Sequence, residues 1–329
     1  MDTIKNKITY ILTPIYALFK QIAPAKNNAN KKWIAHTINL HLTLVCNYAC
    51  GFCYAGFPGI KQKFLNLEVI LEILRQIARA PKPQGCERRK VTFVGGEPLL
   101  FKEIFEAIAY ARSLGLATSL VTNGSLLTED AIRQLGPILD WLTISIDSTD
   151  DTTNLLIGRA FRGKPQTKDE YLQKIKLAQS SGIRVKINTV VNQKNMDEDF
   201  NAFIKQARPT RWKILQASRV EEENGNCFSQ WAVTQEQFDA FVTLHSSLSS
   251  EGITVVPETQ SDIRGSYAMI SPDGRFFDTL EGTYNYSRPI LNVGIEQAFS
   301  EINFSMESFK QRDGDYDFTT GLNTERGAK

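Results

Sequence analysis

The sequence predicts an α/β fold in which a parallel sheet curves into a partial (β/α)6 barrel. Strand-like and helix-like stretches alternate from residue 33 to residue 258, a pattern typical of parallel sheets with crossover helices. About six such units fit, fewer than the eight of a closed barrel. The 329 residues, with 42% hydrophobic and 22% charged side chains, have the composition of a globular protein that can bury a sizeable core.

The individual elements follow from the same alternation. Asn66 is placed to cap the first helix, and Gly115 and Gly182 stand where two later helices should end. The predicted strands are 36–44, 90–96, 116–124, 140–148, 184–192, 211–217 and 252–258. The predicted helices are 66–80, 101–115, 128–135, 168–182, 196–207 and 234–249.

The chain divides into an N-terminal segment with a linker at 1–32, the partial barrel at 33–250, and a C-terminal extension at 251–329. Residues 1–32 contain six lysines and one acidic residue, and apolar residues recur near helical spacing over 4–22. This pattern predicts an amphipathic helix that lies on an anionic membrane surface. The alternative is a helix that packs on its own domain.

Charge and cysteine usage restrict the compartment and the partners. A net charge of +2 argues against direct binding of nucleic acid. No apolar run reaches about 18 residues, so no spanning helix is expected. No secretory signal is evident, which predicts a cytoplasmic protein with reduced thiols. The amphipathic segment at 4–22 predicts peripheral membrane association as the alternative to a purely cytoplasmic location.

The predicted strands alternate polar and apolar residues, although strands of a parallel sheet are usually apolar on both faces. The apolar sets can pack under the helices, so the polar sets should face the interior of the barrel. A one-residue error in register would instead put them at a solvated edge. The predicted inward residues are Thr37, Asn39, His41 and Thr43, then Lys90 and Thr92, then Thr143, Ser145 and Asp147, then Lys186 and Asn188, and finally Arg211 and Lys213.

Four of these inward residues are cations, namely Lys90, Lys186, Arg211 and Lys213, whereas only Asp147 is an anion. A polar interior is unfavourable unless something occupies it and forms hydrogen bonds. The excess of cations predicts a multiply charged anion as that occupant, and a triphosphate is the natural candidate.

Three cysteines, Cys46, Cys50 and Cys53, crowd into the stretch that follows the first predicted strand. Thiolates are the usual ligands of iron–sulfur clusters, and a four-iron cluster held by three of them keeps one iron open to a small molecule. A zinc site that lacks one ligand is the alternative. Cys86 and Cys227 are isolated and are expected to be ordinary thiols.

This CxxxCxxC spacing, with Phe52 before the third cysteine, resembles the radical S-adenosylmethionine superfamily. The stretch VGGEP (94–98) matches a second motif of that superfamily, and VTNGS (121–125) and SIDS (145–148) end later strands. The resemblance implies a 4Fe–4S cluster and S-adenosylmethionine as cofactors. It also implies that Gly95, Gly96 and Glu97 hold the methionine amino group, with Asn123 and Ser145 at the adenosyl moiety.

A narrower resemblance, to the viperin family, runs from about residue 34 to Phe318. It rests on NLHLTLVCNYACGFCY, DSTDDTTNLLIGR, VKINTVVN, TRWKILQ, VPETQSDIRGSY and ILNVGIEQA. Viperins convert a ribonucleoside triphosphate to its 3′-deoxy-3′,4′-didehydro analogue, which terminates viral polymerases. The resemblance implies CTP as the favoured substrate, with UTP or GTP as alternatives, and a reductase or flavodoxin as the electron donor.

The viperin resemblance also implies roles for individual residues. Arg159 falls at the S-adenosylmethionine and phosphate side, and Tyr267 is a candidate catalytic tyrosine that supplies a hydrogen equivalent or packs on the ribose. Val94 departs from the serine of animal viperins, which removes one phosphate hydrogen bond, and the stretch 288–318 could close over the substrate. The implied substrate-binding residues are Asn39, Lys90, Lys186, Asn188, Arg211 and Lys213.

Two rival functions remain at this point. One is another radical enzyme that acts on a nucleotide or modifies a peptide, although no C-terminal cysteine set or paired-arginine tail is present. The other is a non-catalytic, membrane-associated scaffold, which would have no need of the cysteines, the GGEP motif or the inward lysines.

Overall fold

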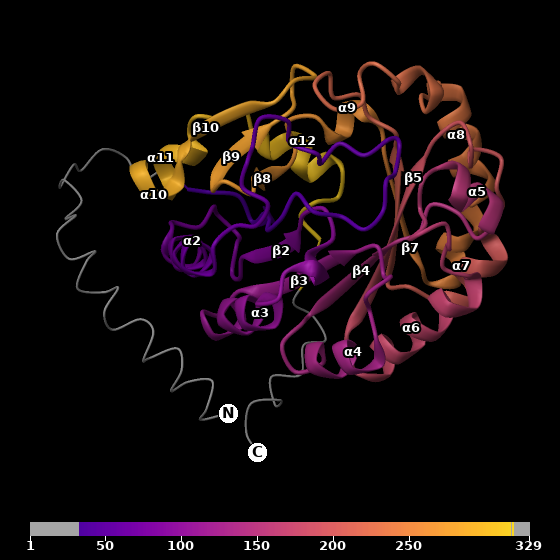
Figure 1. Cartoon of the computed structure of the whole chain (residues 1–329), viewed down its shortest axis with the longest axis horizontal. Helices are drawn as coiled ribbons and strands as arrows, with labels where there is room; N and C mark the ends of the chain where they lie inside the picture. Colours follow the sequence, from indigo (N-terminus) through magenta and orange to yellow (C-terminus); the bar gives the residue numbers. More distant parts are fainter. Residues whose placement is uncertain (1–32, 317, 319–329) are drawn as a thin grey trace. The chain divides into compact units, whose positions relative to one another are not determined.

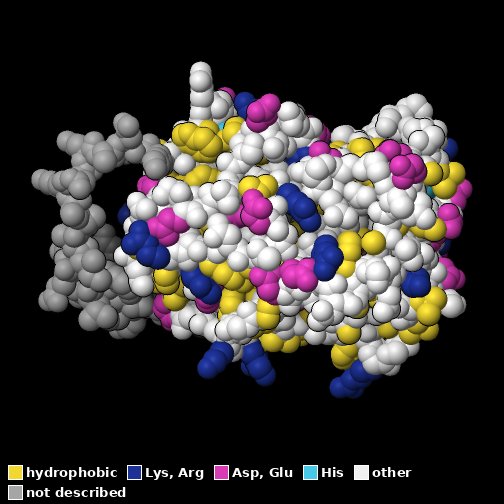
Figure 2. All heavy atoms as spheres, turned by 90° about the horizontal axis from the view of Figure 1, so that it is seen from above, with side chains coloured by type: hydrophobic (Ala, Val, Ile, Leu, Met, Phe, Trp, Pro, Cys, Tyr) yellow, Lys and Arg dark blue, Asp and Glu magenta, His cyan; other side chains and the backbone are white. Residues whose placement is uncertain are grey.

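The computed structural model describes residues 33–316 and residue 318, which belong to one compact unit. The predicted amphipathic helix at 4–22 lies outside the described residues. Within the described part of the chain, no helix has both the length and the hydropathy needed to cross a membrane. Acidic and basic side chains are interspersed on the face shown in Figure 2, in keeping with the small net charge.

The described residues form one ten-stranded sheet with the strand order β10-β9-β8-β1-β2-β3-β4-β5-β6-β7. Neighbours from β8 through β1 to β7 pair in parallel, whereas β9 and β10 are antiparallel. The strands are β1 (Thr37–His41), β2 (Lys90–Val94), β3 (Ala117–Thr122), β4 (Trp141–Ser145), β5 (Arg184–Val191), β6 (Arg211–Gln216), β7 (Thr254–Glu258), β8 (Ala268–Ile270), β9 (Arg275–Asp278) and β10 (Asn285–Pro289).

Each of β1 to β6 is followed by a helix, which confirms the predicted partial (β/α)6 barrel. Figure 1 shows α2, α3, α4, α6 and α7 along the outer side of the curved sheet. The helices are α2 (Leu67–Arg79), α3 (Ile104–Ser113), α4 (Glu129–Leu135), α5 (Asp151–Leu156), α6 (Lys168–Ser180), α7 (Asn201–Ala207), α8 (Gln235–Leu244), α9 (Gln260–Ile263), α10 (Ile290–Val293), α11 (Ile295–Phe299) and α12 (Met306–Gln311). Three 3-10 turns lie at Pro98–Leu100, Phe228–Gln230 and Ser246–Glu251.

The helix signals in the sequence act as expected at α2. The Asn66 side chain accepts a hydrogen bond from the backbone N–H of Glu68 at 2.8 Å, so it caps the helix as predicted. Two predicted helices are shorter in the structure. The helix predicted at 196–207 begins at Asn201, because 193–197 forms turns. The helix predicted at 234–249 ends at Leu244, and a 3-10 turn follows at Ser246–Glu251.

The sheet continues past residue 250, where the extension at 251–329 was predicted to begin. Strand β7 pairs with β6 at one edge, and β8 pairs with β1 at the other. Strands β8, β9 and β10 were not predicted, because they have only three to five residues and show no clear alternation of polar and apolar side chains. The extension therefore adds strands to both sides of the barrel.

The alternation along the strands separates the two faces of the sheet largely as predicted. The apolar residues are fully buried under the helices, among them Ile38, Val91, Ile144 and Ile187. The prediction is wrong for His41, which packs in an edge-to-face contact with Phe57 and bonds to the carbonyl of Ile270 instead of lining a cavity. The cause is β8 and β9, which cover that end of β1.

Candidate active site

The three clustered cysteines lie on the loop that follows β1, and neighbouring loops hold its backbone in place. The N–H groups of Gly96 and Glu97 donate to the carbonyls of Thr43 and Val45, each at 2.8 Å. From the other side, the N–H of Ala49 donates to the carbonyl of Gly158 at 3.1 Å. The loop is thus fixed by backbone contacts, independent of its side chains.

Close approach explains why glycines stand beside the cysteine loop. A Cβ at Gly96 would lie 2.3 Å from the carbonyl oxygen of Val45, and a Cβ at Gly158 would lie 2.1 Å from that of Ala49. Both obstacles are backbone atoms, which cannot move aside as a flexible side chain could. The GGEP motif therefore has a steric role at this loop.

Gly96→Ala is expected to lower the free energy of unfolding by about 1–3 kcal/mol, because the added methyl group overpacks the cysteine loop. Thermal unfolding of the purified protein measures the effect. Gly136→Ala is the matched control: Gly136 has helical dihedrals, and the nearest atom to its added Cβ would be 3.5 Å away. If both variants melt at the same temperature, the close approach at Gly96 is not a constraint.

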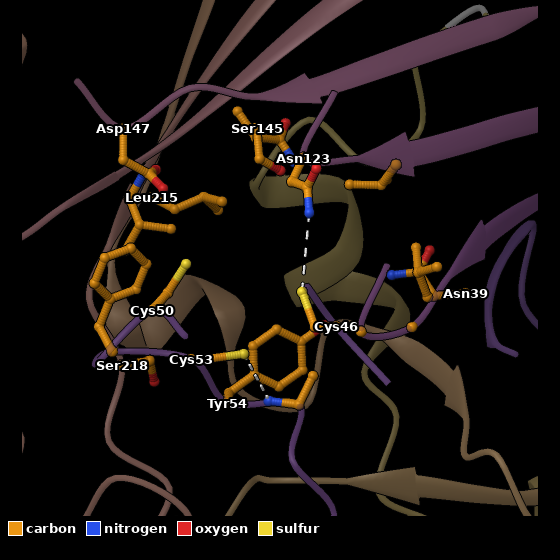
Figure 3. A pocket seen from close by; sticks show the side chains of 18 of the residues that line it. Asn39, Cys46, Cys50, Cys53, Tyr54, Asn123, Ser145, Asp147, Leu215 and Ser218 are labelled. Carbon is orange, nitrogen blue, oxygen red and sulfur yellow. Dashed lines mark hydrogen bonds between the residues drawn. The ribbon is translucent and has the colours of Figure 1, made fainter. Parts of the chain in front are cut away.

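The thiols of Cys46, Cys50 and Cys53 line one cavity of about 290 Å³. Figure 3 shows the three sulfur atoms arranged around one end of this cavity. Within residues 33–316 and 318, no three side chains of metal-binding type lie close enough to share one ion. Three thiols at one end of a cavity suit a 4Fe–4S cluster, which can keep one iron open to a small molecule. This cavity, called the larger cavity below, therefore offers three thiol ligands to a 4Fe–4S cluster.

Arg159 lies against the second thiol, with its Nη1 atom 3.7 Å from the Sγ of Cys50. The guanidinium also donates to the carbonyl of Ser145 at 2.5 Å and pairs with Asp147 at 2.8 Å. Both members of this ion pair are buried, and Ser145, Asp147 and Arg159 all line the larger cavity. Arg159 was predicted at the S-adenosylmethionine and phosphate side, and it lines the cavity of the three thiols but not the cavity of the lysines.

Glu97 does not line the larger cavity, although Gly95 and Gly96 do. Its carboxylate is fully buried and accepts hydrogen bonds from the hydroxyl of Thr122 at 2.7 Å and from the backbone N–H of Asn123 at 2.8 Å. The Asn123 side chain points into the cavity, 3.9 Å from the Sγ of Cys46 (Figure 3). In this structure Glu97 therefore holds the end of β3, and through it Asn123.

A smaller cavity of about 80 Å³ adjoins the larger one inside the barrel. Asn39, Asn188 and Tyr267 line both cavities and so mark the place where they meet. The Oδ1 atom of Asn188 is buried and has no hydrogen-bond partner among the described residues. A buried acceptor without a partner is costly, so this amide suits contact with a ligand.

Lys90, Lys186 and Lys213 line the smaller cavity, as the alternation predicted. Burial lowers the pKa of each of these lysines to about 7. The positive charge of Lys186 lowers the pKa of Lys90 further, and that of Arg211 lowers the pKa of Lys186 further. At Lys213 the negative charge of Glu258 acts in the opposite direction. Three buried ammonium groups so close together favour an anion that could neutralise them.

Binding of a multiply charged anion, such as the predicted triphosphate, is expected to take up protons and to weaken as the pH rises from about 7 to about 9. In the free protein the three lysines lose charge as the pH passes through their pKa of about 7. A bound triphosphate favours the charged form, raises the pKa values and so draws protons from the buffer. Calorimetry in buffers of different ionisation enthalpy measures this uptake. An affinity that stays constant from about pH 7 to about pH 9, without proton uptake, would contradict the placement of the anion on these three lysines.

The chain segment after α12 closes the floor of the smaller cavity. The Tyr316 hydroxyl lies 2.6 Å from Lys90 Nζ and 3.1 Å from Lys186 Nζ. Arg211 lines neither cavity, since its guanidinium stacks on the Tyr316 ring at 3.9 Å and pairs with Asp313 at 2.5 Å. Residues of the predicted closing stretch, 288–318, thus contact the cations predicted to bind substrate.

Several residues around the smaller cavity were not predicted from the sequence. Arg312, Asp313 and Tyr316 line the smaller cavity but follow no alternation that could have selected them. Glu258 was also missed, although it ends a predicted strand, and it is fully buried against Lys213. An isolated acid or arginine carries no pattern, so the only available signal for Glu258 was its place at a strand end.

Comparison with known proteins identifies the class of this fold and site. Residues 40–207, just over half of the chain, match the family model "Radical SAM superfamily". Among solved structures, native anSMEcpe with bound AdoMet aligns with a TM-score of 0.63 at 13% identity, covering 84% of this chain and 82% of that chain. SuiB of Streptococcus suis bound to S-adenosylmethionine aligns with a TM-score of 0.58 at 16% identity, covering 79% and 62%. At such identities the likeness concerns the fold alone.

Curated relatives narrow the class to a family. A relative from Lacinutrix mariniflava is 41% identical over 91% of this chain, which spans only 61% of that protein. A relative from Flammeovirga pacifica is 38% identical over 86% of this chain and 96% of its own length. One from Siniperca chuatsi is 33% identical over 90% of this chain and 84% of its own. All three are named S-adenosylmethionine-dependent nucleotide dehydratases.

The protein is a radical S-adenosylmethionine enzyme, with a 4Fe–4S cluster and S-adenosylmethionine as its cofactors. Within that class the chain belongs to the S-adenosylmethionine-dependent nucleotide dehydratases, the viperin family.

Proposed function

We propose that this enzyme removes water from a ribonucleoside triphosphate to give the 3′-deoxy-3′,4′-didehydro analogue, with CTP favoured and UTP or GTP as alternatives. The observation that carries the proposal is the continuity of the two cavities. Cysteine thiols line the larger cavity, buried lysines line the smaller one, and Asn39, Asn188 and Tyr267 lie where they meet. A nucleotide with its phosphates on the lysines would have its ribose near this junction.

When bound, the cofactors would supply the reductive cleavage of S-adenosylmethionine, which gives methionine and a 5′-deoxyadenosyl radical for hydrogen abstraction. Cys46, Cys50 and Cys53 would hold the cluster, and Gly95, Gly96, Asn123, Ser145 and Arg159 would surround S-adenosylmethionine. Glu97 would act through the position of Asn123. A reductase or a flavodoxin would supply two electrons, one for the cleavage of S-adenosylmethionine and one that, with a proton, completes the alkene as the 3′-hydroxyl leaves as water.

The residues of the chain itself would bind the substrate, orient it and move a proton. Lys90, Lys186 and Lys213 would hold the triphosphate, with Arg211 behind Tyr316. Asn39 and Asn188 would fix the ribose so that its C4′ hydrogen faces the larger cavity. The Tyr267 hydroxyl would supply or relay the hydrogen equivalent that is needed as the 3′-hydroxyl leaves as water.

Two further parts of the proposal concern the product and the location. The dehydrated nucleotide would lack a 3′-hydroxyl and so would terminate the chain made by a viral polymerase. Val94 lines the larger cavity and not the smaller one, so in this pose its lack of a hydroxyl group would not remove a contact to the phosphates. Residues 4–22 would associate with a membrane surface, as their charge and periodicity predict.

An anaerobic assay tests the proposal and names the base. Reconstituted enzyme receives dithionite and S-adenosylmethionine, together with CTP, UTP, GTP or ATP in separate reactions. We expect one triphosphate to give both 5′-deoxyadenosine and a nucleotide lighter by one water, as measured by mass spectrometry. Deoxyadenosine formed equally with and without nucleotide, and no dehydrated product, would leave the radical chemistry but refute the proposed substrate.

A further inference from the structure

Glu258, the last residue of β7, is a fully buried carboxylate in contact with groups that line the smaller cavity. Its Oε1 atom pairs with Lys213 Nζ and lies 3.2 Å from Arg312 Nη1. Its Oε2 atom accepts a hydrogen bond from the Tyr267 hydroxyl at 2.5 Å. Both oxygens are therefore committed to groups that line the smaller cavity.

The three partners of Glu258 come from separate parts of the chain. Lys213 lies on β6, Tyr267 precedes β8 at the other side of the parallel sheet, and Arg312 follows α12. Arg312 is held further by Ser266, whose hydroxyl accepts from Nε at 2.7 Å and whose carbonyl accepts from Nη2 at 2.9 Å. One carboxylate thus joins the barrel wall to the C-terminal extension.

Tyr267 contacts all three charged members of this cluster. Lys213 Nζ donates to its hydroxyl oxygen at 2.6 Å, and the Arg312 guanidinium stacks on its ring at 3.7 Å. The hydroxyl hydrogen is consequently directed to Glu258. Although burial opposes it, the charges of Lys213 and Arg312 hold the pKa of Glu258 below its usual value, so the carboxylate is ionised.

We propose that Glu258 is a positioning residue for the substrate end of the site, which holds Lys213 and Arg312 beside the cavity floor and fixes the orientation of the Tyr267 hydroxyl. The inference rests on the proposed function, since it takes the smaller cavity as the triphosphate site. Two consequences follow. Without the carboxylate, the ammonium group of Lys213 loses its counterion, and the phenol of Tyr267 loses its acceptor.

The test uses Glu258→Gln, which keeps the shape of the side chain and removes its charge. Glu251→Gln is the matched control, since Glu251 is exposed and pairs with Lys205 on the surface, at 3.0 Å. The first measurement is calorimetric binding of CTP, UTP and GTP to the cofactor-free proteins at several pH values. The second is the ratio of 5′-deoxyadenosine to dehydrated nucleotide during turnover.

Both measurements have expected results. The groups that face Glu258 are Lys213, Arg312, Tyr267 and, farther away, Lys186. Loss of the negative charge lowers the pKa of Lys213, so E258Q should bind nucleotide about tenfold more weakly at a pH near 8 and recover at a pH near 6. The neutral amide of Gln is a weaker acceptor than the carboxylate and has one oxygen in place of two, so it should orient the Tyr267 hydroxyl less well and raise the ratio of deoxyadenosine to product about fivefold. E251Q should match the native enzyme in both measurements.

The proposal is overturned if E258Q matches E251Q in the pH dependence of binding and in the product ratio. If E258Q fails to fold, the same two measurements are made on Glu258→Asp, which keeps the charge but has a side chain shorter by one methylene. This variant must then show the raised ratio of deoxyadenosine to dehydrated nucleotide. Failure of the proposed function is distinguishable, because the native enzyme would then form no dehydrated nucleotide from any triphosphate. The calorimetric binding of nucleotide would still show whether Glu258 maintains the charge of Lys213 at the smaller cavity.

Discussion

Cys50→Ala is expected to abolish cleavage of S-adenosylmethionine, with a loss of more than about 10³-fold in the rate of 5′-deoxyadenosine formation. Cys50 is one of three thiols that line the larger cavity, and a cluster left with two protein ligands is not retained. The variant should therefore lack the brown colour of the reconstituted enzyme. Visible absorbance, bound iron and deoxyadenosine are measured together under anaerobic conditions.

Two other cysteines of the chain provide matched controls. Cys86 hydrogen-bonds to the carbonyl of Arg88 and lines neither cavity. Cys227 packs beside Phe52, close to the cysteine loop, but also lies outside both cavities. Cys86→Ala and Cys227→Ala should retain colour and activity. A brown, active Cys50→Ala enzyme would show that the cluster is held elsewhere.

Lys186→Met is expected to lower kcat/KM for the nucleotide about 10²-fold, while S-adenosylmethionine cleavage without nucleotide stays unchanged. The Lys186 ammonium is buried at the floor of the smaller cavity, and one charged hydrogen bond to a phosphate contributes about 1.5–3 kcal/mol. Methionine keeps most of the volume and removes the charge. Steady-state kinetics with the preferred triphosphate measures the effect.

The control for this variant is Lys176→Met on the exposed side of α6, which should behave as the native enzyme. An equal loss of nucleotide-independent cleavage in K186M would indicate damage to the cofactor end of the site. An unchanged kcat/KM would mean that the triphosphate does not lie on the lysines, and the proposed substrate pose would be wrong.

The sequence predicted the cofactor end of the site better than the substrate end, for physical reasons. The three cluster ligands are local in the chain, so their spacing alone indicates them. Lys90, Lys186 and Lys213 were recoverable because side chains two residues apart share one face of a strand. These signals are short-range, and each survives small errors in the predicted boundaries.

The floor of the smaller cavity depends instead on contacts between distant parts of the chain. Asp313 reaches Arg211 over 102 residues, and Tyr316 reaches Lys90 over 226. Such contacts are set by where α12 packs, and no local pattern encodes that. Glu97 shows a related limit, since the GGEP motif indicated the residue but not that its carboxylate would turn inward to β3.

The free protein balances its buried cations with its own groups. Glu258 pairs with Lys213, Asp313 pairs with Arg211, and the Tyr316 hydroxyl contacts two lysines. Uncompensated burial of these charges would be strongly destabilising. A triphosphate can therefore add to this arrangement or displace part of it, which explains how a cationic interior persists in a folded barrel.

Transfer of a labelled hydrogen tests the central claim most directly. The native enzyme is supplied with its preferred triphosphate carrying deuterium at C4′, and the 5′-deoxyadenosine formed is analysed by mass spectrometry. The proposed function predicts one deuterium in the deoxyadenosine and a dehydrated nucleotide that has lost its label. Unlabelled deoxyadenosine beside intact, fully labelled nucleotide would contradict the claim that the radical acts on this substrate.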